Sequence, residues 1–433
     1  MSVEKPPATI HSENLDLERV CQIKSALDQR RLGYGDQQSY SMLVTPDSFN
    51  VCNQEAASVL SQGVWIYHWL EMTNQLYLAG TTNYRYHWIA SLFESNLSPQ
   101  AIKYQRMLAQ RGELPLFARA DLTDFWSAVE VQFRIGGWGY MSAISEVMQA
   151  VNPEPSLGKN VVDIALDSGF AMAVRAKLGR EPHRVVLLCP TNYLGESAYF
   201  ASLLKQRQGL NCEVVLINDW EEEIRDADFI YRRELNLPML AESPTGRKLI
   251  ERNLRGEVAI EPPLNVIFDQ KLAMAFPFHP KLKTLFNDHD RALFAPTHIL
   301  DHLLDLPRWA DDEIVYKYAG SLMKLSFGSR QVWRLDPFSN SRWTTIHRCY
   351  DDLALSGQPW IIQPYYSPKF PVRYFDQEQE SLVEENMHAR FMPIYSRNPQ
   401  TGKICFIGIT ANFRPHWKVR GASDAVLTDV RIK

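Results

Sequence analysis

The sequence lacks both a hydrophobic run long enough to cross a membrane and a strong excess of charge of either sign. No apolar stretch in its 433 residues approaches the roughly 20 residues that span a bilayer. Lysine and arginine total 46 against 50 aspartates and glutamates, and the formal net charge is −4. We therefore expect no membrane segment and no nucleic-acid-binding surface. No apolar segment follows a basic start, so we expect no secretion signal.

Cysteine is scarce and scattered. The six cysteines form no Cys-x-x-Cys pair, which a redox motif or a zinc site would require. They are Cys21, Cys52, Cys189, Cys212, Cys349 and Cys405. In a chain of this length, such thiols are typical of a reducing compartment, so we expect a cytoplasmic protein.

The motifs of several common catalytic sites are also missing. The sequence contains no Gly-x-Gly-x-x-Gly after its first buried strand, no Walker A motif and no Gly-x-Ser-x-Gly elbow. His298 and His302 have the spacing of metal ligands on a helix, but no glutamate follows His298 as His-Glu-x-x-His requires. We interpret both as helix-surface residues. A dinucleotide site, a Walker-type phosphate loop and an α/β-hydrolase triad are therefore disfavoured.

Apolar periodicity predicts a helical N-terminal region followed by a parallel α/β layer. Helices are expected over 15–27, 56–78 and 99–111, with an irregular segment over 32–53. Strands are expected over 183–189, 213–217, 228–232 and 265–269, with a helix over 195–208. Strands that alternate with helices at this spacing are typical of a parallel sheet.

The last third of the chain mixes predicted helices and strands. Helices are expected over 271–286 and 288–304. Strands are expected over 313–318, 331–334, 360–363, 389–395 and 404–410. The last two face each other across a turn rich in turn-forming residues and should be antiparallel.

One predicted hairpin concentrates polar side chains at strand spacing. Arg119 and Asp121 lie two residues apart, and Glu130 and Gln132 repeat this arrangement after a turn. Pairing the two strands would bring these side chains together, with Arg134 beside them. Carboxylate and amide oxygens suit Mg²⁺, and arginines suit the oxygens of a phosphoryl group. An exposed hairpin with ordinary surface charges would show the same spacing, so the pattern alone leaves both interpretations open.

Two later strands could serve a nucleotide. Lys317 ends a strand before a loop that contains Gly320 and Gly328, so the lysine could reach phosphates while the loop closes over them. The strand that ends at Gln363 could form a hinge for an adenine ring. A surface lysine with a hairpin turn, and a core strand with a proline stop, are the plainer interpretations. The glycines at 136–139 permit a tight turn but are weak evidence for phosphate binding.

Taken in order, these segments resemble the ATP-grasp ligases, in the permuted arrangement of glutathionylspermidine synthase and eukaryotic glutathione synthetase. In that group an Arg-x-Asp and a later Glu-x-Asn precede the α/β layer, and the lysine strand, glycine loop and hinge follow it. The residues that match the first part are Arg119-Ala-Asp121 and Glu130-Val-Gln132. Further similar segments are 228–233, 265–271, 315–317, 361–363, 389–390 and 408–414, so the resemblance covers residues 110–425.

The resemblance implies a role for each matched residue. Mg²⁺ would be held by Asp121, Glu130 and Gln132, and the reacting phosphoryl and tetrahedral species would be stabilised by Arg119. The residues that would bind ATP are Lys271, Lys317, Gly320, Ser326, Gly328, Gln363 and Arg390. Gln363 would lie at the adenine hinge. Arg390 would lie near the γ-phosphate and would also be catalytic. The substrate would be contacted by Arg134 and Arg414.

The expected fold is α/β of the α+β type, namely an ATP-grasp fold with a Rossmann-like subdomain and a helical N-terminal region. The expected units are a helical region over 1–110, metal-binding strands over 111–155, a Rossmann-like subdomain over 156–268 and nucleotide-binding subdomains over 269–433.

The expected activity is an ATP- and Mg²⁺-dependent, ADP-forming ligase that joins a small carboxylate to an amine through an acyl phosphate. Gln132 stands where the family has asparagine, the interval from Asp121 to Glu130 is short, and an Asp-Thr-Pro-like run is missing after Gln132. No amidase domain is present, so glutathionylspermidine synthesis itself is not expected. A non-catalytic relative that binds a nucleotide or a partner protein, and a phosphotransferase of the same fold, stay open, as do the two substrates and a homodimeric state.

Overall fold

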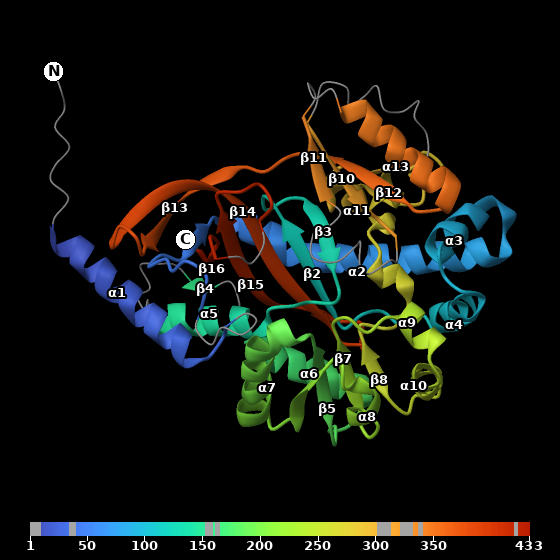
Figure 1. Ribbon diagram of the computed structural model, residues 1–433, viewed down its shortest axis with the longest axis horizontal. Coiled ribbons are helices and arrows are strands. Elements are labelled where there is room, and N and C mark those ends of the chain that lie inside the picture. Colours follow the sequence, from blue (N-terminus) through green and yellow to red (C-terminus); the bar gives the residue numbers. More distant parts are fainter. Residues whose placement is uncertain are drawn as a thin grey trace.

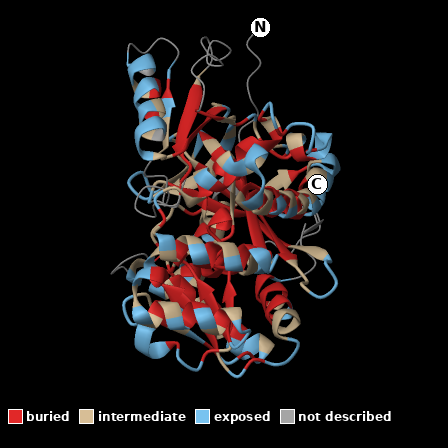
Figure 2. Ribbon diagram, turned by 90° about the vertical axis from the view of Figure 1, so that its right-hand side faces the viewer, coloured by how far each residue is buried: buried red, intermediate tan, exposed pale blue. Residues whose placement is uncertain are grey.

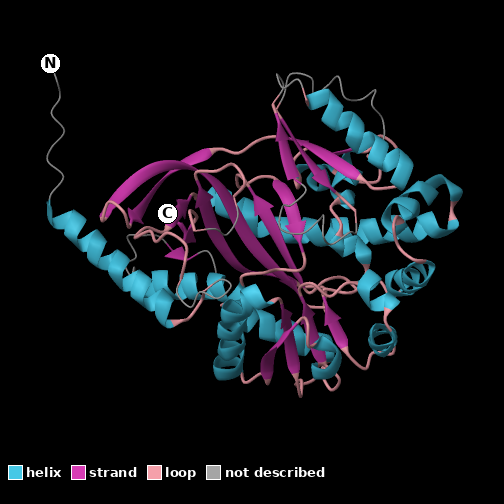
Figure 3. Ribbon diagram, viewed as in Figure 1, coloured by secondary structure: helices cyan, strands magenta, loops and turns pink. Residues whose placement is uncertain are grey.

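The computed structural model describes residues 10–33, 40–151, 159–160, 165–300, 313–320, 332–336, 341–419 and 423–433. Within them, three β-sheets are combined with packed helices in an α+β fold (Figure 1, Figure 3). This fold class agrees with the sequence-based prediction.

The helices are α1 (Ile10–Gln29), α2 (Asn53–Thr82), α3 (His87–Glu94), α4 (Pro99–Gln110), α5 (Trp138–Val151), α6 (Leu166–Leu178), α7 (Leu194–Gln208), α8 (Trp220–Glu223), α9 (Leu237–Glu242), α10 (Pro244–Leu254), α11 (Asp288–Ala292) and α13 (Arg342–Ser356). Short 3₁₀ helices are η1 (Tyr84–Tyr86), η3 (Thr191–Tyr193), η4 (Val266–Asp269) and η5 (Leu272–Phe278). The strands are β1 (Phe49–Val51), β2 (Phe117–Leu122), β3 (Ala128–Gln132), β4 (Lys159–Asn160), β5 (Val185–Cys189), β6 (Cys212–Leu216), β7 (Phe229–Arg232), β8 (Ala259–Glu261), β9 (His298–Ile299), β10 (Ile314–Tyr318), β11 (Val332–Leu335), β12 (Trp360–Pro364), β13 (Lys369–Asp376), β14 (Ser381–Arg397), β15 (Ile404–Arg414) and β16 (Val426–Ile432).

The largest sheet carries the predicted polar hairpin. Its order is β1-β16-β15-β14-β2-β3, with β13 also paired to β14 and β4 to β16. Alternate residues of β14 and β15, such as Phe391 and Phe413, join the core that includes α2. Residues of the opposite parity, such as Met392, join a second core with α1 and α5. Because side chains alternate along a strand, each face of this sheet is covered by different helices.

The α/β layer is parallel, as the sequence predicts. Its order is β6-β5-β7-β8, and the pairs of adjacent strands are parallel. One apolar core joins these strands to α5, α6 and α7, and another joins them to α4, α9 and α10. In Figure 1 this green layer lies below the large sheet.

The third sheet is antiparallel and contains the predicted lysine strand. Its order is β11-β10-β12-β9, and α13 packs against β12. An aromatic cluster of Tyr316, Tyr318 and Trp360 fills its core, where Trp333 stacks on Tyr316 at 5.1 Å between ring centroids.

Three predicted elements between residues 265 and 304 are wrong. Residues 265–269 form η4 rather than a strand, because the Asn265 side chain accepts the Ile267 N–H and begins a helical turn. The predicted helix over 271–286 shortens to η5, whose Pro277 lacks the N–H that an α-helix requires. The predicted helix over 288–304 ends at Ala292 as α11. His298 consequently lies on a strand, β9, and His302 lies outside the described residues.

Buried residues concentrate in the strands and on the inner faces of the helices, and exposed residues occupy the outer helix faces (Figure 2). None of the helices in the described ranges has the length and apolar character needed to cross a membrane.

Candidate active site

The hairpin of β2 and β3 places four polar side chains on one face of the large sheet. Arg119 lies opposite Gln132, and Asp121 lies opposite Glu130. The intervening residues, such as Ala120, belong to the core on the other face. The two-residue spacing seen in the sequence therefore produces one polar surface on adjacent strands.

Asp121 is the centre of this surface. It accepts hydrogen bonds from Arg119 Nε at 2.8 Å, Gln132 Nε2 at 3.0 Å and Arg390 Nη1 at 3.4 Å. Arg119 Nη2 also donates to Gln132 Oε1 at 2.8 Å. Asp121 and Arg119 are only 2% and 7% exposed. The oxygens predicted to bind a metal at Asp121 and Gln132 are thus hydrogen-bonded within the chain, and Arg390 arrives from β14.

Glu130 faces two lysines from other segments. Lys271 Nζ lies 3.2 Å from a Glu130 carboxylate oxygen. Burial raises the pKa of Glu130, but the charges of Lys271, Lys317 and Arg119 outweigh it, so its pKa lies below the ordinary value. Burial lowers the pKa of Lys317 to about 8, although Glu130 opposes this effect. Glu130 is therefore a carboxylate held among cations.

Lys317 and Gln363 lie on neighbouring strands and contact each other. Lys317 Nζ donates to Gln363 Oε1 at 2.5 Å and to the Val129 carbonyl at 2.8 Å. Gln363 Nε2 donates to Thr297 Oγ1 at 2.8 Å. Both polar ends of the Gln363 side chain are therefore used, which leaves only its backbone for the hinge role expected from the resemblance.

The N–H groups of the glycines at the start of α5 are bound by a side chain of the protein itself. Glu196 accepts the N–H of Gly137 at 3.2 Å and of Gly139 at 2.9 Å, and it pairs with Arg233 at 2.5 Å. A Cβ at Gly136 would collide with the Arg233 guanidinium. A carboxylate thus already occupies the anion-binding end of this helix. No local pattern points to Glu196, because it lies 57 residues from Gly139.

The arginines predicted to contact substrate are paired within the protein. Arg134 Nε lies 3.1 Å from Asp269, which Arg232 also contacts at 3.2 Å. These contacts join Arg134 to η4, and its Nη1 also donates to the Arg233 carbonyl after β7 at 3.4 Å. A role of Arg134 beside the metal ligands stays a prediction. Arg414 ends β15 and donates to Asp424 at 2.6 Å.

The predicted glycine loop is described only at its start. Gly320 is buried, and a Cβ there would collide with Tyr318 and approach Pro359, so packing accounts for the glycine. Ser326 and Gly328 lie outside the described residues.

The described cations and carboxylates allow a test of metal binding. Arg119, Arg390, Lys271 and Lys317 carry four positive charges, and Asp121 and Glu130 carry two negative ones, so the cluster has a net charge of +2. No cluster of three or more histidine, cysteine or acidic side chains suited to a metal occurs in the described ranges. The oxygen donors fit Mg²⁺, but this charge fits the ion only together with a polyanion such as ATP, whose Mg²⁺ complex carries about −2.

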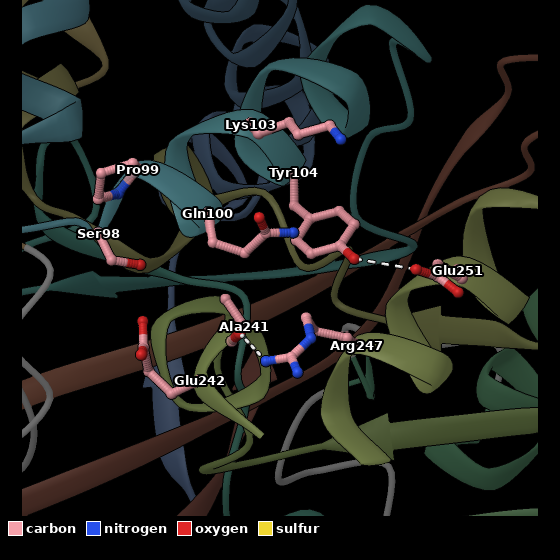
Figure 4. A pocket seen from close by; sticks show the side chains of 9 residues that line it. All are labelled: Ser98, Pro99, Gln100, Lys103, Tyr104, Ala241, Glu242, Arg247 and Glu251. Carbon is pink, nitrogen blue, oxygen red and sulfur yellow. Dashed lines mark hydrogen bonds between the residues drawn. The ribbon is translucent and has the colours of Figure 1, made fainter. Parts of the chain in front are cut away.

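A separate surface cleft of about 630 Å³ lies between α4, α9 and α10 (Figure 4). Tyr104 donates to Glu251 at 3.1 Å, and Arg247 donates to the Ala241 carbonyl at 3.1 Å. None of the residues singled out by the sequence lines it.

Comparison with known proteins finds a likeness among solved structures but none among protein families or curated proteins. No family model matches the chain, and no curated protein matches it. A solved structure of a glutathione synthetase-like effector (GSS30) from Globodera pallida, in its apo form, is similar over 99% of this chain and 98% of that chain. The TM-score is 0.62 and the sequence identity 11%. The chain therefore has a glutathione synthetase-like fold, which is the coarser part of the resemblance inferred from the sequence.

Proposed function

We propose that the protein is an ATP- and Mg²⁺-dependent carboxylate–amine ligase. The observation that carries the proposal is the convergence of Arg119, Asp121, Glu130, Lys271 and Lys317, with Arg390 from β14, on one cationic surface. These groups come from separate segments and meet where two sheets adjoin. A buried surface of net positive charge suits a bound polyphosphate.

In this function the lysines bind and neutralise phosphate oxygens. Lys317 is held by the Val129 carbonyl and by Gln363, so its ammonium is fixed before a nucleotide arrives. Mg²⁺ bound with the nucleotide would be held by Glu130, with Asp121 and Gln132 beside it, and would neutralise charge on the transferred phosphoryl group.

The two arginines stabilise the reacting carboxylate. Arg119 and Arg390 both contact Asp121, which fixes their guanidinium groups on the same surface. A carboxylate that accepts a phosphoryl group, and the tetrahedral species formed when an amine attacks it, both expose oxyanions that such donors stabilise. No protein nucleophile is needed, since the amine attacks the acyl phosphate directly and phosphate leaves.

A second candidate is a non-catalytic relative that binds a nucleotide or a partner protein. It is favoured by the internal pairing of the site, in which Asp121 and Gln132 are bound by Arg119, and Glu130 by Lys271.

ADP release measured with panels of carboxylic acids and amines separates these candidates. The ligase requires acid and amine together, and Glu130→Ala should abolish the signal. Release with acid alone indicates a phosphotransferase. Nucleotide binding without ADP release from any mixture indicates the non-catalytic relative, and the ligase proposal then fails.

A further inference from the structure

A chain of hydrogen bonds behind Lys317 runs through two buried side chains. Lys317 Nζ donates to Gln363 Oε1 at 2.5 Å, and Gln363 Nε2 donates to Thr297 Oγ1 at 2.8 Å. The Thr297 hydroxyl in turn donates to the Ala295 carbonyl at 2.7 Å. Gln363 is 2% exposed and Thr297 is 0% exposed. The chain therefore ends in the protein interior, at a threonine that no sequence motif singles out.

The chemistry of its members fixes the direction of each hydrogen bond in this chain. A lysine ammonium has only donors, so the end of the Gln363 amide that faces Lys317 must be its oxygen. The Thr297 hydroxyl has a single hydrogen, and the Ala295 carbonyl accepts it. Thr297 can therefore only accept from Gln363, which requires the amide NH₂ on its side. Thr297 thus selects the orientation of the amide in which the oxygen faces Lys317.

The same chain of hydrogen bonds begins and ends at β3. Lys317 Nζ also donates to the Val129 carbonyl of β3 at 2.8 Å. The segment before Thr297 pairs with the preceding residue of that strand, because the Ala295 N–H donates to the Ala128 carbonyl at 3.1 Å. Both ends of the chain are therefore attached to adjacent residues of β3, next to the proposed metal ligand of that strand.

One donor of the Lys317 ammonium is left for a ligand. An ammonium has three N–H groups, of which Gln363 accepts one and Val129 another. The third has no hydrogen-bond partner among the residues that the structure describes. Because two acceptors hold the ammonium, the direction of the third N–H is fixed as well, which is the preorganisation that an oxyanion ligand requires.

We infer that Thr297 is a positioning residue for the phosphates of the nucleotide. This inference rests on the proposed function, in which Lys317 binds ATP. Thr297 holds the Gln363 amide in the orientation that accepts from Lys317, and the amide and the Val129 carbonyl together direct the remaining N–H to a phosphate oxygen. Without the hydroxyl, the amide NH₂ can turn toward the ammonium, where two donors oppose each other and the lysine loses an acceptor.

A purely structural role for Thr297 makes a different prediction. A buried amide that loses its partner lowers stability in either case, so stability alone does not separate the two roles. Positioning acts through Lys317, whereas packing does not. The Thr297 hydroxyl should therefore matter for ATP affinity only while Lys317 is present.

ATP affinity, measured by calorimetry in a double-mutant cycle, tests the inference. Thr297→Val keeps the shape of the side chain and removes the hydroxyl, and it should weaken ATP binding roughly fivefold or more. In the Lys317→Met background the same substitution should change ATP affinity less than about twofold, because the lysine that it positions is gone. Thr297→Ser keeps the hydroxyl and should keep the affinity of wild type.

Thr73→Val is the matched control. Thr73 of α2 is also 0% exposed, and its hydroxyl donates to the Trp69 carbonyl at 2.8 Å. This variant should keep ATP affinity, whatever its effect on stability. Unchanged ATP affinity in Thr297→Val, equal weakening in both backgrounds, or no ATP binding by wild type overturns the inference. Intact ATP binding without ADP release refutes the ligase instead and leaves the role of Thr297 in place.

Gln363→Leu covers the case in which Thr297→Val does not fold. Replacing both partners of a hydrogen bond by apolar side chains leaves neither without a partner, so Gln363→Leu combined with Thr297→Val should fold. The ATP affinity of this double variant should equal that of Gln363→Leu alone, since both lack the amide through which Thr297 acts. A further loss of affinity in the double variant contradicts the assigned role.

Discussion

Glu261→Gln should stabilise the protein above neutral pH, because the Glu261 carboxyl is buried and bound to backbone N–H groups. Glu261 is 1% exposed and accepts the N–H groups of Leu116 at 2.8 Å and Phe117 at 3.4 Å. Burial raises its pKa from 4.5 to about 8, although Lys177 and Arg232 and both N–H groups oppose the rise. At pH values between 4.5 and about 8, the carboxyl is therefore protonated in the folded protein and ionised in the unfolded chain.

The sign and size of the effect follow from this difference. A raised carboxyl pKa gives stability that is complete below pH 4.5 and is lost as pH rises through about 8. Between these two pH values the free energy of unfolding falls by about 1.4 kcal/mol for each pH unit, so the loss near pH 7 is about 3 kcal/mol. The glutamine amide keeps an acceptor oxygen for both N–H groups and cannot ionise.

Unfolding by urea and by heat, at pH 5 and at pH 8, tests this reasoning. Glu261→Gln should match wild type at pH 5 and exceed it at pH 8 by a few kcal/mol, which in a chain of 433 residues corresponds to roughly 3–5 °C in melting temperature. Glu257→Gln is the control, because Glu257 is a surface residue paired with Arg255, and it should show no such gain. A difference between Glu261→Gln and wild type that is the same at both pH values refutes the argument.

Further predictions concern the candidate site. Mg²⁺ titrated into nucleotide-free protein should give no binding heat, whereas Mg²⁺ with ATP should bind, because the cluster has a net charge of +2; tight binding of the bare ion would contradict the charge argument. Glu130→Ala should abolish turnover with the fold intact by circular dichroism, and activity within about tenfold of wild type, about 1.4 kcal/mol in barrier, would remove Glu130 from the site. Lys271→Met and Lys317→Met should each weaken ATP binding at least tenfold by calorimetry, with exposed Lys283→Met as the control. Arg119→Lys should keep substrate affinities and lower kcat by orders of magnitude, because lysine cannot contact Asp121 and Gln132 with a rigid fork of donors; a raised KM with kcat intact would make Arg119 a substrate anchor instead.

Local patterns predicted the parts of the fold that depend on local forces. The two-residue spacing of Arg119 and Asp121, and of Glu130 and Gln132, is sufficient to place four side chains on one face once the strands pair. Apolar runs likewise located β5, β6 and β7 of the α/β layer but missed β8 (Ala259–Glu261), because the strand predicted over 265–269 is η4. The wrong helix over 271–286 shows the limit, since Pro277 and tertiary packing decided that segment.

The rest of the site depends on contacts that no local pattern reports. Arg390 meets Asp121 across 269 residues, and Glu196 fills the start of α5 from a different helix. Arg390 itself lies in a long strand, and only the pairing of β14 with β2 brings it to Asp121.

The pairing of β2 with β14 also determines when the large sheet can form during translation. About 260 residues separate Gln132 from Arg390, so at a synthesis rate of about 5–20 residues per second the hairpin waits roughly 10–50 s for its neighbour. During that interval one edge of β2 presents unpaired backbone groups, which other extended chains can join. Charged side chains on an exposed strand disfavour such pairing, and Arg119, Asp121 and Glu130 of this hairpin are expected to have that effect before β14 is made. Nascent chains stalled before β14 are therefore expected to be clients of chaperones, and those stalled after β15 are not.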